Sequence, residues 1–444
     1  MVILKIGPYR VLWLPDENDA RLRVRRGGRA CGTMVSFGLE GVMIKMLDKQ
    51  SRLTVAAGLA AIAFAASPAL SQSTIKIGAP LALTGGLADE GKKQVVVWDM
   101  WLAKVNAAGG INVGGKKMKV EIVKYDYQTN GTRAGQLAEK LITDDKVNFL
   151  LAPFGSGHTK IVAAVAERYQ VPLLACVSSS ESVFNQGLKN LFGTLSPNGG
   201  VTTAVVKYFM KQLPSLKRVA VLGRDDVFPK SMAVGISESS KQLGLNVVYN
   251  QYYAVGTMDH SAALSAIKAA RPDWIYATGY TQDLILIRKQ MVDLGVKAPI
   301  VSMMTGPAYK EFADGLGDLA NGITSSNWWH HAVKYKGVGV WPTTDDFYKE
   351  FVAKNKHDPD YVHASCAGGI VVLQDAIERA GTLDKGKVRE ALAKTDVQTF
   401  YGPVKFSANG MNQQRDLPII QVQDRKIKVL NPPEIKDADF QVMK

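Results

Sequence analysis

The chain has 444 residues, a formal net charge of +14 at pH 7 and 46% hydrophobic residues, which is long enough for two domains of ordinary size. Its lysines are spread along predicted helix faces rather than gathered into a run, so the positive charge does not indicate nucleic-acid binding. Three cysteines are too few for a disulfide framework.

Residues 1–45 read as an upstream extension that follows from an over-early start codon. The segment holds a cluster of arginines and shows no clear apolar period, so we expect it to be disordered. Met43 and Met46 are the candidates for the true start, because an export signal follows them directly.

Residues 46–71 have the pattern of an export signal. Lys49 and Arg52 provide a positive start, residues 53–66 are small or apolar without a charge, and Ala69-Leu70-Ser71 matches a small-x-small cleavage site. We therefore expect export across a bacterial inner membrane to the periplasm, with cleavage near Ala69 to Gln72. No later apolar run approaches the length of a membrane span, so we expect no stable membrane insertion after cleavage.

Short apolar strands then alternate with amphipathic helices, which is the pattern of a parallel sheet covered on both faces. The expected strands are 75–83, 118–126, 148–154 and 171–177, and the expected helices are 90–107, 134–143 and 158–169.

A turn-rich junction at 195–200 precedes a second run of the same kind. The sequence thus predicts an α/β fold of two doubly wound parallel-sheet lobes, with a helical stretch after Trp328 and a terminal hairpin around Asp424-Arg425. The expected helices are 201–212, 231–243, 261–270, 282–293, 345–356, 364–379 and 385–394, and the expected strands are 218–223, 246–253, 273–279, 298–303, 417–423 and 426–430.

Signatures of catalysis are missing. Residues 86–92 nearly fit a P-loop, but Lys93 stands where a phosphate site needs Ser or Thr. No G-x-G-x-x-G follows a strand, and the glycines around Ser156 do not form a nucleophile elbow. The adjacent His330 and His331 would point apart in a strand and have no Cys/His cluster beside them. We therefore expect no catalytic residues, no cofactor and no metal site.

Small hydroxyls do follow two strands of the first lobe. Ser156, Gly157, His158 and Thr159 open a helix, and Ser178 to Ser180 follow the next strand. Such groups can hold an anion at the positive end of a helix dipole, in the crevice where open α/β sheets bind ligands. Helix capping is the alternative role of these residues.

Strand ends of the second lobe deliver an acidic pair and apolar side chains. Together with the serines they would suit a small carboxylate with an apolar or aromatic body, although each aromatic residue alone is more often part of a core. The residues concerned are Asp225, Asp226, Phe228, Tyr280, Met303 and Met304, with Trp328 and Trp329 from the segment that crosses between lobes.

Two cysteines, Cys176 and Cys366, lie beyond the signal segment. They could pair in an oxidising compartment or remain free as small buried hydrophobic residues. The sequence does not decide between these states.

Several phrases resemble one family. They are VNAAGGINVGGKK (105–117), VPLLA (171–175), YFMKQLPSLKRVAVLGRDDVF (208–228) and the stretch from IVVLQDAIERAG to VKFSANGMN (370–412). Across nearly all of 74–430 the chain is similar to the periplasmic branched-chain amino acid binding proteins. These are type I solute-binding components of ABC importers, in the amino acid and amide uptake group.

The resemblance implies a clamp of two lobes that closes around its ligand and is then presented to permease subunits. Three crossings are expected, near Thr194, Ser325 to Trp328, and Tyr401 to Val404. Lobe I would comprise 74–193 plus 327–400, and lobe II 195–324 plus 403–444.

By the same resemblance, a ligand carboxylate would be held by Ser156 and Gly157 and by Ser178 and Ser180, with Tyr280 opposite. Phe228 departs from the family pattern, which has a tyrosine there. Met304 lies where relatives place a glutamate for the α-ammonium, and MMTGPAY (303–309) contains no acid. Trp329 completes the predicted ligand-binding set.

A buried ammonium without a carboxylate is costly. Either Asp225, Asp226 or Asp89 replaces the glutamate, or the ligand has no α-ammonium. We therefore expect an apolar or aromatic acid, with a hydrophobic amino acid or amide close behind. The alternatives to a transport protein are a ligand-sensing partner of a receptor and a periplasmic two-lobed α/β enzyme.

Overall fold

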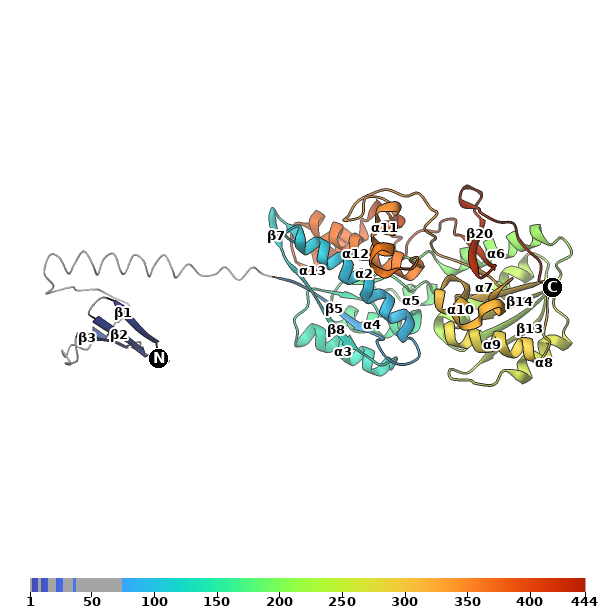
Figure 1. Cartoon of the computed structure of the whole chain (residues 1–444), viewed down its shortest axis with the longest axis horizontal. Coiled ribbons are helices and arrows are strands. Elements are labelled where there is room, and N and C mark those ends of the chain that lie inside the picture. The colour runs from blue at the N-terminus through green and yellow to red at the C-terminus, as the bar shows by residue number, and fades with distance from the viewer. Residues whose placement is uncertain (1, 7–8, 15–20, 27–34, 37–73, 444) are drawn as a thin grey trace. The chain divides into compact units, whose positions relative to one another are not determined.

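The computed structural model describes residues 2–6, 9–14, 21–26, 35–36 and 74–443. The chain divides into two compact units, Met1–Ser71 and Gln72–Lys444, and each is considered by itself (Figure 1). The predicted export signal at 46–71 lies outside the described residues.

The described part of the first unit is a four-stranded antiparallel sheet. Its sequence alternates in places, as in the R-L-R-V-R-R of the third strand, and this period of two suits a strand. The strands are β1 (Val2–Ile6), β2 (Tyr9–Leu14), β3 (Arg21–Arg26) and β4 (Val35–Ser36).

The second unit begins with a parallel five-stranded sheet in the order β11-β10-β9-β5-β8. The predicted strands are present but mostly shorter, and the three-residue β11 was not predicted because it carries too few residues for a pattern. The strands are β5 (Ile75–Leu81), β8 (Val120–Asp126), β9 (Phe149–Leu151), β10 (Leu173–Ala175) and β11 (Leu191–Gly193).

Helices cover both faces of this sheet, as the alternating pattern predicts. In Figure 1, α2, α12 and α13 lie on one side of β5 and β8, and α3 and α4 lie on the other. A small hairpin, β6 (Ile111–Val113) and β7 (Lys116–Met118), follows α2. The helices are α2 (Ala88–Ala107), α3 (Gly131–Thr143), α4 (Ser156–Arg168), α5 (Glu181–Phe184), α11 (Thr344–Asn355), α12 (Tyr361–Ala380) and α13 (Lys385–Ala393).

A disulfide joins Cys176, just after β10, to Cys366 on α12, with an S–S distance of 2.07 Å. The Ser365 hydroxyl donates to the main-chain oxygen of Cys176 at 2.7 Å. The bond closes a sequence separation of 190 residues, so it ties the late helix α12 to the sheet formed early in the chain.

The second sheet has seven strands in the order β13-β12-β14-β15-β16-β19-β20. The first five are parallel, and β19 and β20 run antiparallel as the predicted terminal hairpin, with positive φ at Asp424 and Arg425. The strands are β12 (Arg218–Arg224), β13 (Asn246–Tyr253), β14 (Trp274–Thr278), β15 (Ile300–Met304), β16 (Thr324–Ser326), β19 (Ile419–Gln423) and β20 (Lys426–Asn431).

Helices also flank the second sheet, so both sheets have the doubly wound plan that the sequence predicts. Within the described residues, no helix combines the length and the apolarity required to cross a bilayer. The helices are α6 (Asn198–Gln212), α7 (Val227–Gln242), α8 (Ser261–Ala269), α9 (Thr281–Asp293) and α10 (Lys310–Leu316).

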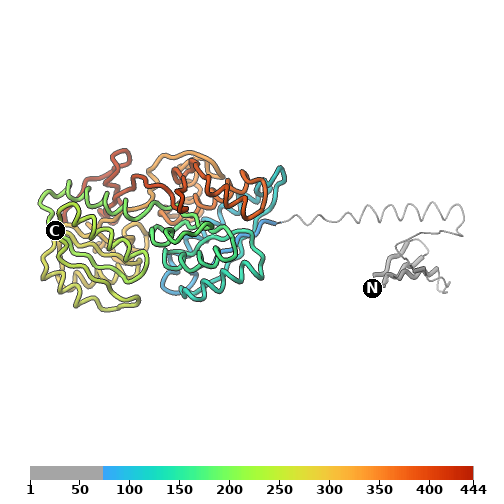
Figure 2. Tube along the Cα trace, turned by 180° about the vertical axis from the view of Figure 1, so that it is seen from behind, coloured from blue at the N-terminus to red at the C-terminus, as the bar shows by residue number. Residues whose placement is uncertain are grey.

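The chain passes between the two sheets three times. The first passage follows β11 and the second follows β16. The third passage lies between Met411, which pairs with Gly193 of β11, and Ile419, where the second sheet resumes. Figure 2 shows this late, red segment running from one sheet to the other.

We therefore define lobe I as residues 74–193 plus 329–412, and lobe II as residues 198–326 plus 419–443. The hairpin β17 (Asp396–Thr399) and β18 (Gly402–Lys405) belongs to lobe I, since Thr399 bridges Val338 in the same lobe.

Candidate functional site

A cluster of buried serines lies where α4 begins. Gly155 has a φ of 86°, which only glycine adopts readily, and this turn sets Ser156 at the first position of the helix. The Ser156 Oγ accepts hydrogen bonds from the main-chain N–H groups of Ser179 and Ser180, each at 3.3 Å, and from the Ser178 hydroxyl at 3.3 Å. The structure thus brings the two predicted serine loops together at the positive end of the α4 dipole.

This serine cluster borders lobe II. The Ser180 hydroxyl donates to the main-chain oxygen of Val227 at 3.4 Å. A Cβ added at Gly157 would lie 2.8 Å from Asp226 Oδ1, so glycine allows the start of α4 to approach the start of α7. Both predicted lobe I loops therefore lie at the interface between the lobes.

Aromatic rings continue the interface from one lobe to the other. Tyr280 is held by its main-chain N–H, which donates to Asp283 Oδ2 at 3.0 Å, and Asp283 is fixed by Arg224 at 2.8 Å. The contacting ring pairs are Phe154–Tyr280 (5.7 Å between centroids), Tyr280–Phe228 (6.4 Å), Phe228–Trp328 (5.9 Å), Trp328–Tyr361 (5.1 Å) and Tyr361–Tyr309 (5.6 Å). We call these six residues the aromatic chain.

Two predicted site residues differ from the others in their contacts. Met304, at the end of β15, is buried and its sulfur accepts from the hydroxyls of Ser325 and Ser326. Trp329 packs against Phe347 of lobe I at 6.1 Å between centroids, whereas its neighbour Trp328 joins the aromatic chain. The structure therefore groups Ser156, Gly157, Ser178, Ser180, Phe228 and Tyr280 at the interface, and it places Trp329 elsewhere.

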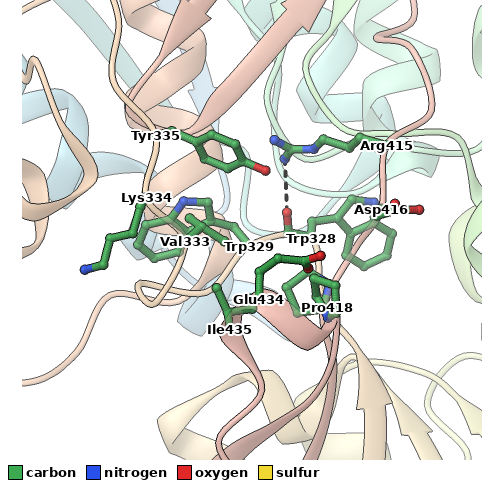
Figure 3. Close-up of a pocket in the computed structure, with 11 residues that line it drawn as sticks. Trp328, Trp329, Val333, Lys334, Tyr335, Arg415, Asp416, Pro418, Glu434 and Ile435 are labelled. Carbon is green, nitrogen blue, oxygen red and sulfur yellow. Dashed lines mark hydrogen bonds between the residues drawn. The ribbon is translucent and has the colours of Figure 1, made fainter.

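Trp329 instead lines a cavity of about 440 Å³ beside the lobe crossings (Figure 3). Arg415 borders this cavity and joins the crossings, because its guanidinium donates to the main-chain oxygens of Trp328 and Tyr401, both at 3.0 Å. The walls of the cavity contain the cationic side chains of Lys334 and Arg415 and the acidic side chains of Asp416 and Glu434.

The acids considered as substitutes for a glutamate after β15 have other roles. Asp225 pairs with Lys230 at 2.7 Å on the surface, and Asp226 accepts from the N–H of Val227 at the start of α7. Asp89 accepts from the side-chain amide of Gln282 across the lobe interface at 3.2 Å.

The residue next to Asp89 is the acid that sequence reasoning missed. Glu90 is 2% exposed, and its Oε1 accepts from the Thr281 hydroxyl of lobe II at 2.8 Å. Burial raises the pKa of Glu90, although Lys93 and the Thr281 hydroxyl oppose this effect. The sequence predicts that Glu90 lies in the first turn of a helix. It does not predict which face of α2 contacts lobe II.

Lys93, one turn along α2, is also buried and links the lobes. It pairs with Asp360 of lobe I at 2.7 Å and with Glu311 of lobe II at 2.9 Å, and it lies 3.8 Å from the centre of the Tyr309 ring. Burial alone would lower its pKa, but Asp360 and Glu311 together raise it. Lys93 thus remains charged within the interface.

The predicted histidine pair also differs from its expected geometry. His330 and His331 lie in a loop with ring centroids 4.2 Å apart, and His331 stacks on Tyr348. Burial lowers the pKa of His330 to about 4. Within residues 74–443, no group of three His, Cys, Asp or Glu side chains is placed to hold a metal ion.

Comparisons with known proteins agree with this architecture. The Leu/Ile/Val-binding protein homolog 7 of Brucella abortus (strain 2308) is 25% identical over 394 residues, which cover 85% of this chain and 96% of that protein. A branched-chain amino acid transporter substrate-binding protein of Streptococcus pneumoniae, solved with isoleucine, has a TM-score of 0.72 at 23% identity, covering 81% of this chain and all of that one.

A solute-binding protein of an ABC transporter from Rhodopseudomonas palustris, solved with benzoate, has a TM-score of 0.69 at 20% identity, covering 83% of this chain and 99% of that one. The sequence model of a family described as periplasmic binding protein matches residues 74–426. Its members bind solutes and are not enzymes, in agreement with the expectation from the missing catalytic motifs. The chain belongs to the periplasmic binding protein family.

Proposed function

We propose that this chain captures a small carboxylate with an apolar or aromatic body between its lobes and delivers it to the permease subunits of an ABC importer. The observation that carries the proposal is the buried Ser156 cluster at the start of α4, which faces lobe II. The Ser156 Oγ is the acceptor in each of its hydrogen bonds with Ser178, Ser179 and Ser180, so the proton of this hydroxyl remains to be donated to a ligand oxygen.

The aromatic chain supports the apolar part of the proposed ligand. Rings of Phe228 and Tyr280 from lobe II and of Phe154 from lobe I would contact the ligand body from both sides. Contacts with both lobes are required if the ligand is to favour the closed arrangement over an open one. The relatives solved with isoleucine and with benzoate bind ligands of this general kind.

The similarity to substrate-binding proteins of ABC transporters supports the proposed delivery to a permease. We propose that the chain is exported, that the signal at 46–71 is removed near Ala69 to Gln72, and that the periplasmic form docks on the importer. Mass spectrometry of the protein recovered from the periplasm should give the mass of a chain whose first residue lies close to Gln72. A product that retains residues 1–45 would contradict the proposed processing.

A thermal-shift screen followed by calorimetry tests the binding function. Amino acids, amides and small aromatic acids are added to the purified protein, and a compound that binds only the folded form raises the melting temperature. Ser156→Ala should weaken the best ligand about tenfold to a hundredfold, because a hydrogen bond to a charged group is lost.

The matched control for this test is Ser179→Ala. It removes a hydroxyl from the same loop but leaves the Ser156 Oγ and its main-chain donors in place. We expect the control to bind within about twofold of the unmodified protein. Equal affinity of Ser156→Ala and the unmodified protein would contradict the proposed carboxylate site.

A further inference from the structure

Glu90 is a buried acid at the lobe interface that lacks a salt bridge. Its side chain accepts a hydrogen bond from Thr281, and no cation of the described residues lies within ion-pair distance of it. Lys93, the nearest cation, is already engaged by Asp360 and Glu311. Burying a carboxylate without a counter-charge is costly, and a polar group kept in such a place requires an explanation.

The backbone around Glu90 holds it firmly in this place. A Cβ added at Gly91 would lie 2.0 Å from the main-chain oxygen of Ala82, so only glycine allows the first turn of α2 to rest against the end of β5. Helix α2 therefore presents Glu90 to Thr281 of lobe II with little freedom to withdraw.

Three tyrosines of the lobe interface are affected by the negative charge of Glu90. Burial is the main cause that raises the pKa of Tyr280, Tyr309 and Tyr361, and the negative charge of Glu90 raises the pKa of each further. All three belong to the aromatic chain. Aromatic faces attract an ammonium group, so rings and a carboxylate together form a favourable environment for a cation.

The other acids at the interface are engaged elsewhere. Asp360 is paired with Lys93 and His363, Asp283 is paired with Arg224, and Asp226 accepts from the start of α7. Asp89 contacts Gln282 and is only partly buried. Among these acids of the described residues, Glu90 is therefore the one that is buried and forms no ion pair.

We infer that Glu90 supplies the counter-charge for the ammonium group of the ligand, so that the ligand is an α-amino acid with an apolar side chain. The inference rests on the proposed function and narrows it. The Ser156 cluster would hold the ligand carboxylate, Glu90 its ammonium, and the aromatic chain its side chain. This arrangement makes an acid in the loop after β15 unnecessary.

Paired ligands that differ only in the amine test the role of Glu90. Calorimetry compares leucine with 4-methylpentanoate, and phenylalanine with 3-phenylpropanoate, on the unmodified full chain and on Glu90→Gln. The unmodified protein should prefer the amino acid of each pair. Glu90→Gln should weaken the amino acid about thirtyfold or more and change the amine-free acid by no more than about twofold.

Asp89→Asn is the matched control, because it neutralises the neighbouring acid while leaving Glu90 and Thr281 in place. It should retain the preference for amino acids. The melting temperature of ligand-free Glu90→Gln, within a few degrees of the unmodified protein, establishes that the variant folds.

Two results would overturn the role of Glu90 while leaving the proposed function intact. One is a Glu90→Gln variant that loses both ligands of a pair equally, which is the result of a merely structural role. The other is an unmodified protein that binds the amine-free acids as tightly as the amino acids. Binding of neither kind of compound would contradict the proposed ligand class itself, and the inference with it.

Discussion

The two lobes present different chemistry to their common interface. Lobe I contributes hydroxyls, main-chain N–H groups and the buried charges Glu90 and Lys93, whereas lobe II contributes mainly the rings of Phe228, Tyr280 and Tyr309. Lobe I is also cross-linked by the Cys176–Cys366 disulfide, and no described residue of lobe II forms such a bond.

This difference leads us to expect that the two lobes contact different parts of the ligand. Polar groups need fixed partners to offset the cost of their desolvation, so the cross-linked lobe I suits the charged end of a ligand. Apolar contacts are less directional, so lobe II can close over the ligand body. Variants of lobe I should therefore change which polar groups are recognised, and variants of lobe II should change the response to side-chain size.

The largest expected effect comes from removing the cross-link of lobe I. Replacing Cys176 and Cys366 together by alanine should lower the free energy of unfolding by about 2–5 kcal/mol, because the bond closes a long loop in the denatured chain. Urea denaturation measures the loss. Hydrogen exchange should show faster opening of α12 and β10 with little change in α6 and α7. An equal increase in the rate of hydrogen exchange in both lobes would contradict the expectation that the disulfide stabilises mainly lobe I.

The next effect concerns the buried charge of lobe I. Lys93→Met leaves Asp360 buried without its lysine, which should lower the free energy of unfolding by about 3–4 kcal/mol. Lys334→Met, which breaks the exposed pair with Asp345, is the control and should cost no more than about 1 kcal/mol.

Acid titration of Lys93→Met gives a second readout. Burial alone would raise the pKa of Asp360, but His363 and Lys93 together hold it below its ordinary value of 3.8. A lowered pKa stabilises the fold above that value, and the contribution is lost as the pH falls below it. The unmodified protein should thus lose more stability than Lys93→Met between pH values of about 5 and 2. Parallel curves for the two proteins would show that Lys93 does not set this dependence.

A smaller effect is expected from the apolar wall of lobe II. If the ligand binds as proposed, Phe228→Ala should reduce affinity by about 1–2 kcal/mol, because the ring that packs against Tyr280 and Trp328 is lost from the proposed apolar wall. Calorimetry with alanine, valine and leucine should show that each added carbon of the ligand increases the affinity of Phe228→Ala less than that of the unmodified protein. The variant should keep any preference of the unmodified protein for ligands with an amine. Loss of that preference would show that lobe II also contributes to recognition of the polar end of the ligand.

The smallest effect is expected at the ion pair between Glu311 of lobe II and Lys93 of lobe I. Glu311 is 38% exposed in its pair with Lys93, so Glu311→Gln should change ligand affinity by no more than about 1 kcal/mol. The difference should shrink at high salt, because exposed pairs are screened. A loss of ligand affinity well above about 1 kcal/mol would mean that Glu311 is an essential part of the proposed lobe closure.

Much of the fold was predictable because its signals are local. The alternation of strands and helices gave two doubly wound lobes, and the hairpin at Asp424-Arg425 followed from two strand patterns with a two-residue turn. The three-residue strands β11 and β16 were missed, because they hold too few residues for a period to show. The segment of 1–45 was expected to be disordered although part of it alternates like a strand.

The candidate site was predictable only in part. Ser156, Ser178 and Ser180 follow strands whose carboxyl ends meet in any parallel sheet, so their proximity was an expectation that needed no contact information. Trp328 and Trp329 could not be separated, because adjacent side chains in a crossing segment take directions set by their surroundings. The structure joins the first to Phe228 and the second to Phe347.

The sequence by itself determined the order of elements, the two sheets and the serine loops, because strand and helix periods and turn residues act over a few neighbouring positions. Only the tertiary structure decided that Cys176 pairs with Cys366, that the third crossing follows Met411, and that Glu90 is buried against Thr281. Each of these is a contact between segments far apart in the chain. Such contacts depend on how the lobes pack, and no local period records them.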